Sequence, residues 1–404
     1  MPEFEYIART AENKVERGML LAQDERDLEQ KLHQRNLVLT SSRVGSAASS
    51  VSRFMSSFQS VPAVEKIFFT QYLHVMIRAG FSIARALNTL TQQTTNKFFK
   101  KVITEVRADV ESGMAFSKSL AKHPKIFNEL YVNMVAAGES SGKLDEVLST
   151  LAIKMKKDHG LVSKVKGALT YPIIILVIML GVAILMAVVV IPQLASIFSE
   201  NDAQMPLMTR ILMWISSFLI DNGVIVLAAL IALTFVFLRL LKTKKGKHLF
   251  DTVILRSPVA GTIVKKVNLA RFTRSLSSML ETNIPIIETF MIISRTMGNT
   301  FYKAAFEEAA HRLKTGNTIS HNLEAYPMLF PPLTTQMISI GEESGSLDAI
   351  SGELATFYEE EVDQTMANLS TIIEPILMLL LGVGVALMAV AIILPIYSLS
   401  EQIG

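Results

Sequence analysis

Two long stretches of this chain repeat each other without a gap. The motif G-E-x-S-G-x-L-D begins at Gly138 and again at Gly341, an offset of 203 residues. Identical residues coincide at this offset throughout the two stretches. The pairs include Phe69 and Phe272, Leu73 and Leu276, Met76 and Met279, Gly113 and Gly316, Pro124 and Pro327, Phe127 and Phe330, Pro172 and Pro375, and Pro192 and Pro395. The chain therefore contains two copies of one unit in the same orientation.

Each copy ends in an apolar run long enough to cross a membrane. Residues 171–191 carry no charge, and as a helix they would span about 30 Å, the thickness of a hydrocarbon core. The second copy ends in the uncharged run 375–399, with Glu374 at its entrance. A further run, 222–238, lies between the copies and has no repeat partner. We expect it to return the chain across the membrane, so that both copies keep the same orientation.

Basic residues predict the orientation of these spans. The loop between the first two spans has Arg210 as its only basic residue, whereas ten basic residues flank the other ends. They are Lys154, Lys156, Lys157, Lys164, Lys166, Arg239, Lys242, Lys244, Lys245 and Lys247. By the positive-inside rule, both copies and the N-terminus are expected in the cytoplasm, with the C-terminus in the periplasm. The N-terminal residues lack an apolar stretch of signal-peptide length, so we expect the first span to be a retained anchor.

Helical spacing of apolar residues within each copy predicts roughly six helices. Gly80, Gly113 and Pro124 mark breaks between them. We expect Gly138 to close one helix and Lys143 to begin the last, which continues into the membrane. Each copy is thus predicted to be an all-α bundle.

A small module precedes the first copy and has no repeat partner. Residues 4–8 alternate like a strand, Asn13 marks a turn, and residues 37–39 favour a closing strand. Asp24 and Asp27 are candidate caps for a helix that carries Leu28 and Leu32. The Ser-rich stretch 41–60 is typical of a linker.

These patterns predict an all-α membrane protein with two tandem cytoplasmic helical bundles, three transmembrane helices and a small N-terminal α+β module. The expected segments are the module at 1–40, a linker at 41–64, the first bundle at 65–167, transmembrane helices at 168–192, 216–240 and 371–399, a periplasmic loop at 193–215, the second bundle at 241–370 and a periplasmic tail at 400–404.

Motifs that resemble catalytic sites lack the context that the chemistry needs. Ser140 lies in a G-x-S-x-G pattern, but helices are predicted on both sides and Glu343 occupies the equivalent place in the second copy. The Gly142-Lys143 pair lacks the spacing of a phosphate loop. There is no cysteine, and the seven histidines form no H-E-x-x-H pair. We therefore predict no catalytic, cofactor-binding or metal-binding residue and, with a formal charge of only +3, no nucleic-acid partner.

Charged residues around the two turns are candidates for partner binding. They are Glu139, Lys143 and Asp145 in the first copy and Glu342, Glu343 and Asp348 in the second. The alternative is that each acid caps the helix that follows it. Tyr171 and Glu374 occupy equivalent positions at the membrane entrances, where a polar group is either hydrated at the interface or functional within the membrane.

Several segments resemble the inner-membrane platform proteins of type II secretion and type IV pilus machines. Beside the two G-E-x-S-G-x-L-D motifs they are an F-x-Y-x-A start, PVAG at 258–261, ARFTRSL at 270–276, FPPLTTQMISIGEESGSLD at 330–348, FYEEEVD at 357–363 and EPILMLLLGVGVALMAVAIILPIY at 374–397. The resemblance implies a non-enzymatic platform in the bacterial inner membrane without a cofactor. It also implies as partners a hexameric cytoplasmic assembly ATPase, pilin or pseudopilin subunits, other inner-membrane assembly proteins, membrane lipid, and a second copy of the chain.

Two alternatives belong to other classes. A secondary transporter also contains repeats, but it places polar sites at the membrane midplane and normally has more spans. A membrane-tethered scaffold would share the architecture without binding an ATPase or a prepilin.

Overall fold

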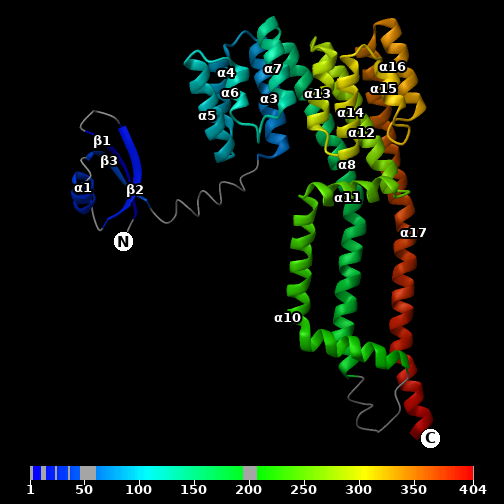
Figure 1. Ribbon diagram of the computed structural model, residues 1–404. Coiled ribbons are helices and arrows are strands. Elements are labelled where there is room, and N and C mark those ends of the chain that lie inside the picture. The colour runs from blue at the N-terminus through cyan, green and yellow to red at the C-terminus, as the bar shows by residue number, and fades with distance from the viewer. Residues whose placement is uncertain are drawn as a thin grey trace. The chain divides into compact units, whose positions relative to one another are not determined.

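The computed structural model describes residues 3–10, 15–22, 25–34, 37–45, 61–193 and 207–403. Contacts group the chain into two units, which Figure 1 shows together. The first is Met1–Pro62 with Thr95–Lys101, and the second is Ala63–Thr94 with Val102–Gly404. Each unit is described by itself.

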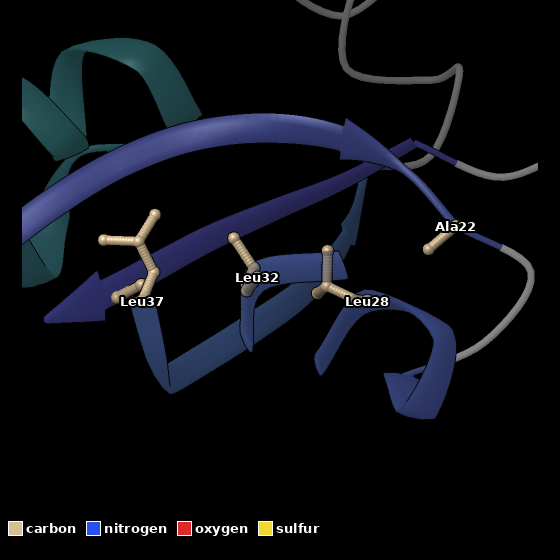
Figure 2. Close-up of a cluster of buried hydrophobic side chains, with 5 residues drawn as sticks. Ala22, Leu28, Leu32 and Leu37 are labelled. Atoms are coloured by element: carbon tan, nitrogen blue, oxygen red, sulfur yellow. The ribbon is translucent and has the colours of Figure 1, made fainter. Parts of the chain in front are cut away.

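The N-terminal module is a three-stranded antiparallel sheet with one helix. Strands β1 (Glu3–Thr10), β2 (Val15–Leu21) and β3 (Leu37–Gly45) lie in the order β2-β1-β3, and α1 is Glu25–His33. Figure 2 shows Leu28 and Leu32 of α1 directed toward the strands, beside Ala22 and Leu37. Because α1 offers leucines at an i, i+4 spacing to the alternating face of β1, a core forms even in this short segment.

The predicted first strand and helix are confirmed here, and three details differ. Strand β2 was not predicted, since VERGMLL alternates poorly and depends on its pairing with β1. The expected linker is wrong at its start, because Ser41 and Ser42 pair with Ile7 and Tyr6 inside β3. Asp27 lies within α1 and binds Lys31 instead of capping the helix. Asn13, Asp24 and residues 46–60 lie outside the described residues.

Two sets of six helices follow each other, as the repeat predicts. The first copy consists of α3 (Ala63–Arg78), α4 (Ile83–Gln93), α5 (Lys97–Glu111), α6 (Phe116–Ala121), α7 (Glu129–Ser141) and α8 (Leu144–Leu185). The second consists of α12 (Ala260–Glu281), α13 (Ile286–Thr296), α14 (Thr300–Leu313), α15 (Ile319–Glu324), α16 (Pro332–Ser344) and α17 (Leu347–Ile403). The bounds of α4, α6 and α7 recur in α13, α15 and α16 at an offset of 203 residues, which confirms the repeat.

Left-handed residues end several of these helices. Gly80 and Gly113 have φ angles of +84° and +91°, which explains why glycine stands at these predicted breaks. The position equivalent to Gly80 is Asn283, with φ of +57°. Asparagine tolerates this region better than other side chains do, so the backbone turn survives the change of residue.

The core of each bundle has the same positions but different side chains. In the second copy Phe272, Phe290, Phe306 and Phe330 surround one another, with ring centroids 4.5 to 6.0 Å apart. The first copy keeps the equivalents of Phe272 and Phe330, and it places buried aliphatic side chains, Leu87 and Ile103, at the other two positions. The repeat therefore preserves burial at these positions more strictly than residue type.

Three helices are long and apolar enough to cross a membrane, which confirms the predicted number of spans. They are Leu144–Gln193, Met213–Leu241 and Leu347–Leu387. Helix α8 continues through a π-helical turn, η1 (Met186–Val190), where Ser216 donates a hydrogen bond to the Ala187 carbonyl. A hydroxyl bound at this point accommodates the wider helical turn.

The helix that returns the chain across the membrane between the two copies is longer than expected. Helix α10 (Leu207–Leu241) begins inside the expected loop at 193–215, of which residues 194–206 lie outside the described residues. It bends at Asn222, where φ is −116° and ψ is 16°, so that its first part and the run 222–238 are two segments (Figure 1). A short helix, α11 (Lys244–Arg256), connects it to α12.

Candidate functional site

The two G-E-x-S-G motifs form matching turns between the last two helices of each copy. Gly142 closes α7 with φ of +73°, and Gly345 closes α16 with φ of +66°. The amide of Lys143 donates to the Gly138 carbonyl at 2.9 Å. The prediction that Gly138 ends the helix is therefore wrong, because it lies one turn earlier, inside α7.

Glycine at position 138 is required by packing. A Cβ atom placed there would lie 2.8 Å from Cγ2 of Val147 and 3.2 Å from Cα of Leu144. At Gly341, the nearest atom would be Cα of Leu347, at 3.1 Å. The motif thus lets two consecutive helices approach more closely than any side chain allows, and its second glycine turns the chain between them.

Glu139 caps a different helix from the one predicted. Its carboxylate accepts hydrogen bonds from the amide of Phe116 at 2.7 Å and from the amide and hydroxyl of Ser117 at 3.0 and 2.6 Å. These groups form the N-terminus of α6, which precedes the turn in the chain, whereas the prediction was a cap of the following helix. The carboxylate therefore fastens α6 onto α7 and satisfies the free amides of α6.

These bonds determine the charge state of Glu139. Burial raises its pKa, but the hydrogen bonds from Ser117 and Phe116 outweigh burial and hold the pKa of Glu139 below its ordinary value. The carboxylate is therefore ionised at neutral pH. A depressed pKa means that this interaction stabilises the fold fully above the unfolded-state pKa and is lost as the pH falls through the folded-state pKa.

Glu342 makes the same arrangement in the second copy. Its carboxylate accepts from the amides of Ile319 at 2.5 Å and Ser320 at 2.9 Å, at the N-terminus of α15. Two of the six predicted partner-binding residues thus have an internal partner already.

The other four predicted residues are more accessible. Lys143 is exposed and pairs with Glu146 at 3.2 Å, and Glu343 is exposed and accepts from Ser339 at 3.2 Å. Asp348 is exposed in the first turn of α17. Asp145 is half-buried, and its carbonyl oxygen binds Nδ1 of His74 at 2.8 Å.

Both turns lie far from the membrane-crossing parts of the helices they begin. From Leu144 to Tyr171 helix α8 is continuous, and at 1.5 Å per residue this stretch is about 40 Å long. The stretch of α17 from Leu347 to Pro375 is similar, about 40 Å. Each turn is therefore at the distal end of a continuous helix, here called a rod, that leads into a candidate span.

A charged cluster joins the two copies beside these rods. Glu359 of α17 accepts from Nε of Arg274 at 2.8 Å and pairs with Nζ of Lys157, on α8, at 2.9 Å. Lys164 of α8 also binds Asp363 of α17. Burial raises the pKa of Glu359, but the hydrogen bonds and charges of Arg274 and Lys157 outweigh it, so its pKa lies below its ordinary value.

Sequence reasoning missed this cluster, although the repeat contains a signal for it. Lys156 and Lys157 are equivalent to Glu359 and Glu360 at the offset of 203 residues. Because equivalent positions of the two copies carry opposite charges, helices α8 and α17 can form ion pairs with each other. A charge comparison between the aligned copies would have pointed to Glu359.

The two polar residues predicted at the membrane entrances lie at equivalent places on the surface of the two long helices. Tyr171 in α8 and Glu374 in α17 are both exposed, and each is followed by a proline inside the helix. The structure does not bring them together with the turns.

The catalytic-looking motif has the expected helical context. Ser140 lies in the last turn of α7, where its hydroxyl donates to the Ala137 carbonyl at 3.0 Å. Among the described residues, no group of three or more His, Asp or Glu side chains is placed to hold a metal ion.

Fold and turns together define a multi-pass membrane protein made of two tandem six-helix bundles, each ending in a spanning helix. Family models agree with this class. The model described as type II secretion system protein F matches residues 69–192 and again 272–395, and the model of its N-terminal domain matches residues 1–43. The chain belongs to the type II secretion system protein F family. This family and the three apolar helices together make it an inner-membrane protein.

Similar proteins include members of both kinds of machine. The type IV pilus assembly protein PilC of Thermus thermophilus is 34% identical over 400 residues, covering 99% of this chain and 98% of its own. PilC of Pseudomonas aeruginosa is 34% identical over 337 residues, covering 83% and 90%. The type II secretion system protein F of Vibrio cholerae is 29% identical over 405 residues, covering 99% of both chains. These relatives favour the platform over the transporter and scaffold alternatives.

Glu139→Gln tests the structural role of the turn. The amide keeps the shape of the side chain but replaces charge-assisted bonds by weaker ones, so we expect a loss of about 1 to 2 kcal/mol of stability at neutral pH. The difference from the parent should shrink as the pH falls through the depressed pKa of Glu139, since the parent then loses the same charge. Thermal unfolding in detergent across pH measures this.

The matched control is Glu343→Gln, which changes an exposed carboxylate of the second turn. It should alter stability by no more than about 0.5 kcal/mol at any pH. Equal melting of the Glu139→Gln variant and the parent at neutral pH would contradict a capping role.

Proposed function

We propose that this chain is the inner-membrane platform of a type IV pilus assembly machine, which couples a cytoplasmic assembly ATPase to the insertion of pilin subunits. Relatives named for pilus or fimbrial assembly are 30% to 34% identical, against 28% to 29% for those named for type II secretion. The higher identity supports the pilus machine over a secretion system with pseudopilins.

The observation that carries the proposal is the continuity of α8 and α17. Each helix begins at a membrane-distal turn and enters the membrane without an interruption among the described residues. A partner that moves a turn would therefore displace a span, since an α-helix transmits force along its axis. This role is mechanical, and we infer that the chain has no enzymatic activity of its own.

Orientation follows from charge. Lysines and arginines cluster where the spans meet the bundles, which supports cytoplasmic bundles, a cytoplasmic N-terminus and a periplasmic C-terminus. In this orientation both turns face the compartment that contains the ATPase.

Single cysteines introduced into this Cys-free chain test the orientation. Cysteines at Ser140 and Ser344, both exposed in the bundles, should resist an impermeant maleimide in intact cells and react after lysis. A cysteine at Arg210 should react in intact cells. Labelling of Ser344→Cys from outside would overturn the proposed topology.

The exposed charges of the turns are the proposed docking points for the ATPase. Lys143, Glu343 and Asp348 are accessible, and Asp145 is half-buried. Glu139 and Glu342 support the same surface from within, because each fastens a short helix beneath the turn. We expect pilin, other inner-membrane proteins and a second copy of the chain to bind elsewhere, with Tyr171 and Glu374 exposed to partners at the membrane.

Charge reversal separates docking from scaffolding. The variant Glu343→Lys with Asp348→Lys should melt like the parent, because both side chains are exposed, yet retain less ATPase in a pulldown and assemble few pili. The charge-matched control is Glu288→Lys with Glu307→Lys, two exposed acids on α13 and α14. The first copy is tested in the same way by Lys143→Glu, whose side chain is exposed.

Association at the turns should also become slower at high salt, because exposed charges act chiefly on the association rate. If the reversed variants bind the ATPase and build pili as the control does, the turns are scaffold only and the docking proposal is wrong.

A further inference from the structure

Helix α11 connects the return span to the second bundle, and one of its faces is fixed to that bundle. Asp251 is buried and accepts hydrogen bonds from the amide and hydroxyl of Thr300 at 2.8 Å each. The ring of His248 lies against that of Phe301, with centroids 4.6 Å apart. Asp251 and His248 are three residues apart, so they define the face that contacts α14.

The opposite face of α11 is apolar and uncovered among the described residues. Leu249 and Val253, one helical turn apart, are 66% and 61% exposed, and Phe250 is 38% exposed. A soluble helix would normally bury such a face against its own domain. In α11 the face that packs against the bundle is the other one, which carries His248 and Asp251 and contacts α14.

The apolar face lies on the membrane side of the helix. Phe250 meets Phe237 of α10 edge-on, with ring centroids 6.3 Å apart, and Phe237 belongs to the candidate span Met213–Leu241. Between the two helices the chain turns at Thr243, whose hydroxyl accepts from the amide of Gly246 at 3.1 Å. Figure 1 shows the result: α11 runs across the bundle end of α10.

Exposed basic side chains lie along this apolar face and at the start of the helix. Lys244, Lys245, Lys247 and Arg256 of α11 are all exposed, and so is Lys242 immediately before it. The one acid in the helix, Asp251, is buried and bound to Thr300, so it does not offset these charges at the surface. An apolar face with exposed cations along it, continuous with a membrane span, is the pattern of a helix that lies in a lipid interface.

We propose that α11 lies in the headgroup layer of the leaflet that faces the bundles, with Leu249, Phe250 and Val253 inserted and its lysines bound to anionic phospholipid. The exposed lysines identify the occupant, since an anionic headgroup complements them and a neutral protein surface does not. The helix anchors the second bundle at a fixed height above the membrane. Residues 41–53, at the equivalent place before the first bundle, are Ser-rich and lack this pattern.

Depth-dependent quenching in nanodiscs tests the proposal on the full-length chain. Single cysteines at Leu249 and Val253 carry an environment-sensitive fluorophore, and a nitroxide on the lipid near the headgroup is the quencher. The control is Ile340→Cys on α16, 51% exposed in the same bundle but next to the membrane-distal turn. We expect the nitroxide lipid to reduce fluorescence at 249 and 253 at least about twofold more than at 340.

The lipid preference is tested with discs of phosphatidylcholine alone and discs that also contain phosphatidylglycerol. Quenching at 249 should be stronger with phosphatidylglycerol, and the triple variant Lys244→Gln, Lys245→Gln, Lys247→Gln should remove that difference. Quenching at 249 and 253 no greater than at 340 would overturn insertion, and would assign the face to a protein partner. Equal quenching in both kinds of disc would overturn recognition of the anionic headgroup. Only variants that unfold at the same temperature as the parent protein are compared.

Discussion

The structure depends on two helices that do not stop at the membrane surface. Helices α8 and α17 each begin in a bundle, pack along it, and then become a span. Since both copies point the same way, a chain with two such helices needs a third span to return, and α10 supplies it. The number of spans and the position of α10 between the copies both follow from this one constraint.

Each rod is held at its distal end by glycine and a carboxylate. Gly138 lets α7 approach α8 closely, and Glu139 fastens α6 to α7, so the turn between α7 and α8 has little freedom to move separately. Prolines at 172 and 375 remove one backbone donor where each rod enters the membrane, yet both helices continue through them. Each rod therefore lacks one backbone hydrogen bond at the membrane entrance but remains one continuous helix.

Ion pairs between opposite charges hold the two copies against each other. Glu359 of α17 lies between Arg274 of its own copy and Lys157 of the other, and Arg295 reaches across to Glu129. A buried carboxylate that lost either cation would keep its desolvation cost, so the copies are held in one register. A displacement of one turn would then be transmitted through these ion pairs to both α8 and α17.

Much of the fold was predictable because it is encoded locally. Charge-free runs, glycines at helix breaks and the repeat itself are visible in the sequence. They predicted the spans, the six helices per copy and the turns. What could not be predicted depends on tertiary contacts. Glu139 binds α6, 22 residues earlier, and Glu359 binds α8 of the other copy. Strand β2 forms because β1 is beside it, and Gly138 serves packing instead of ending a helix.

Rigidity of the two rods is the central claim, and hydrogen exchange tests it most directly. In nanodiscs, amides in residues 158–171 and 361–374, where the bundles meet the membrane, should exchange as slowly as those of α12 in the bundle core. Slow exchange there is the expected result, because an intact helix protects its amides. Exchange as fast as in the exposed loops between helices would reveal a hinge, and would contradict the transmission of force along α8 and α17.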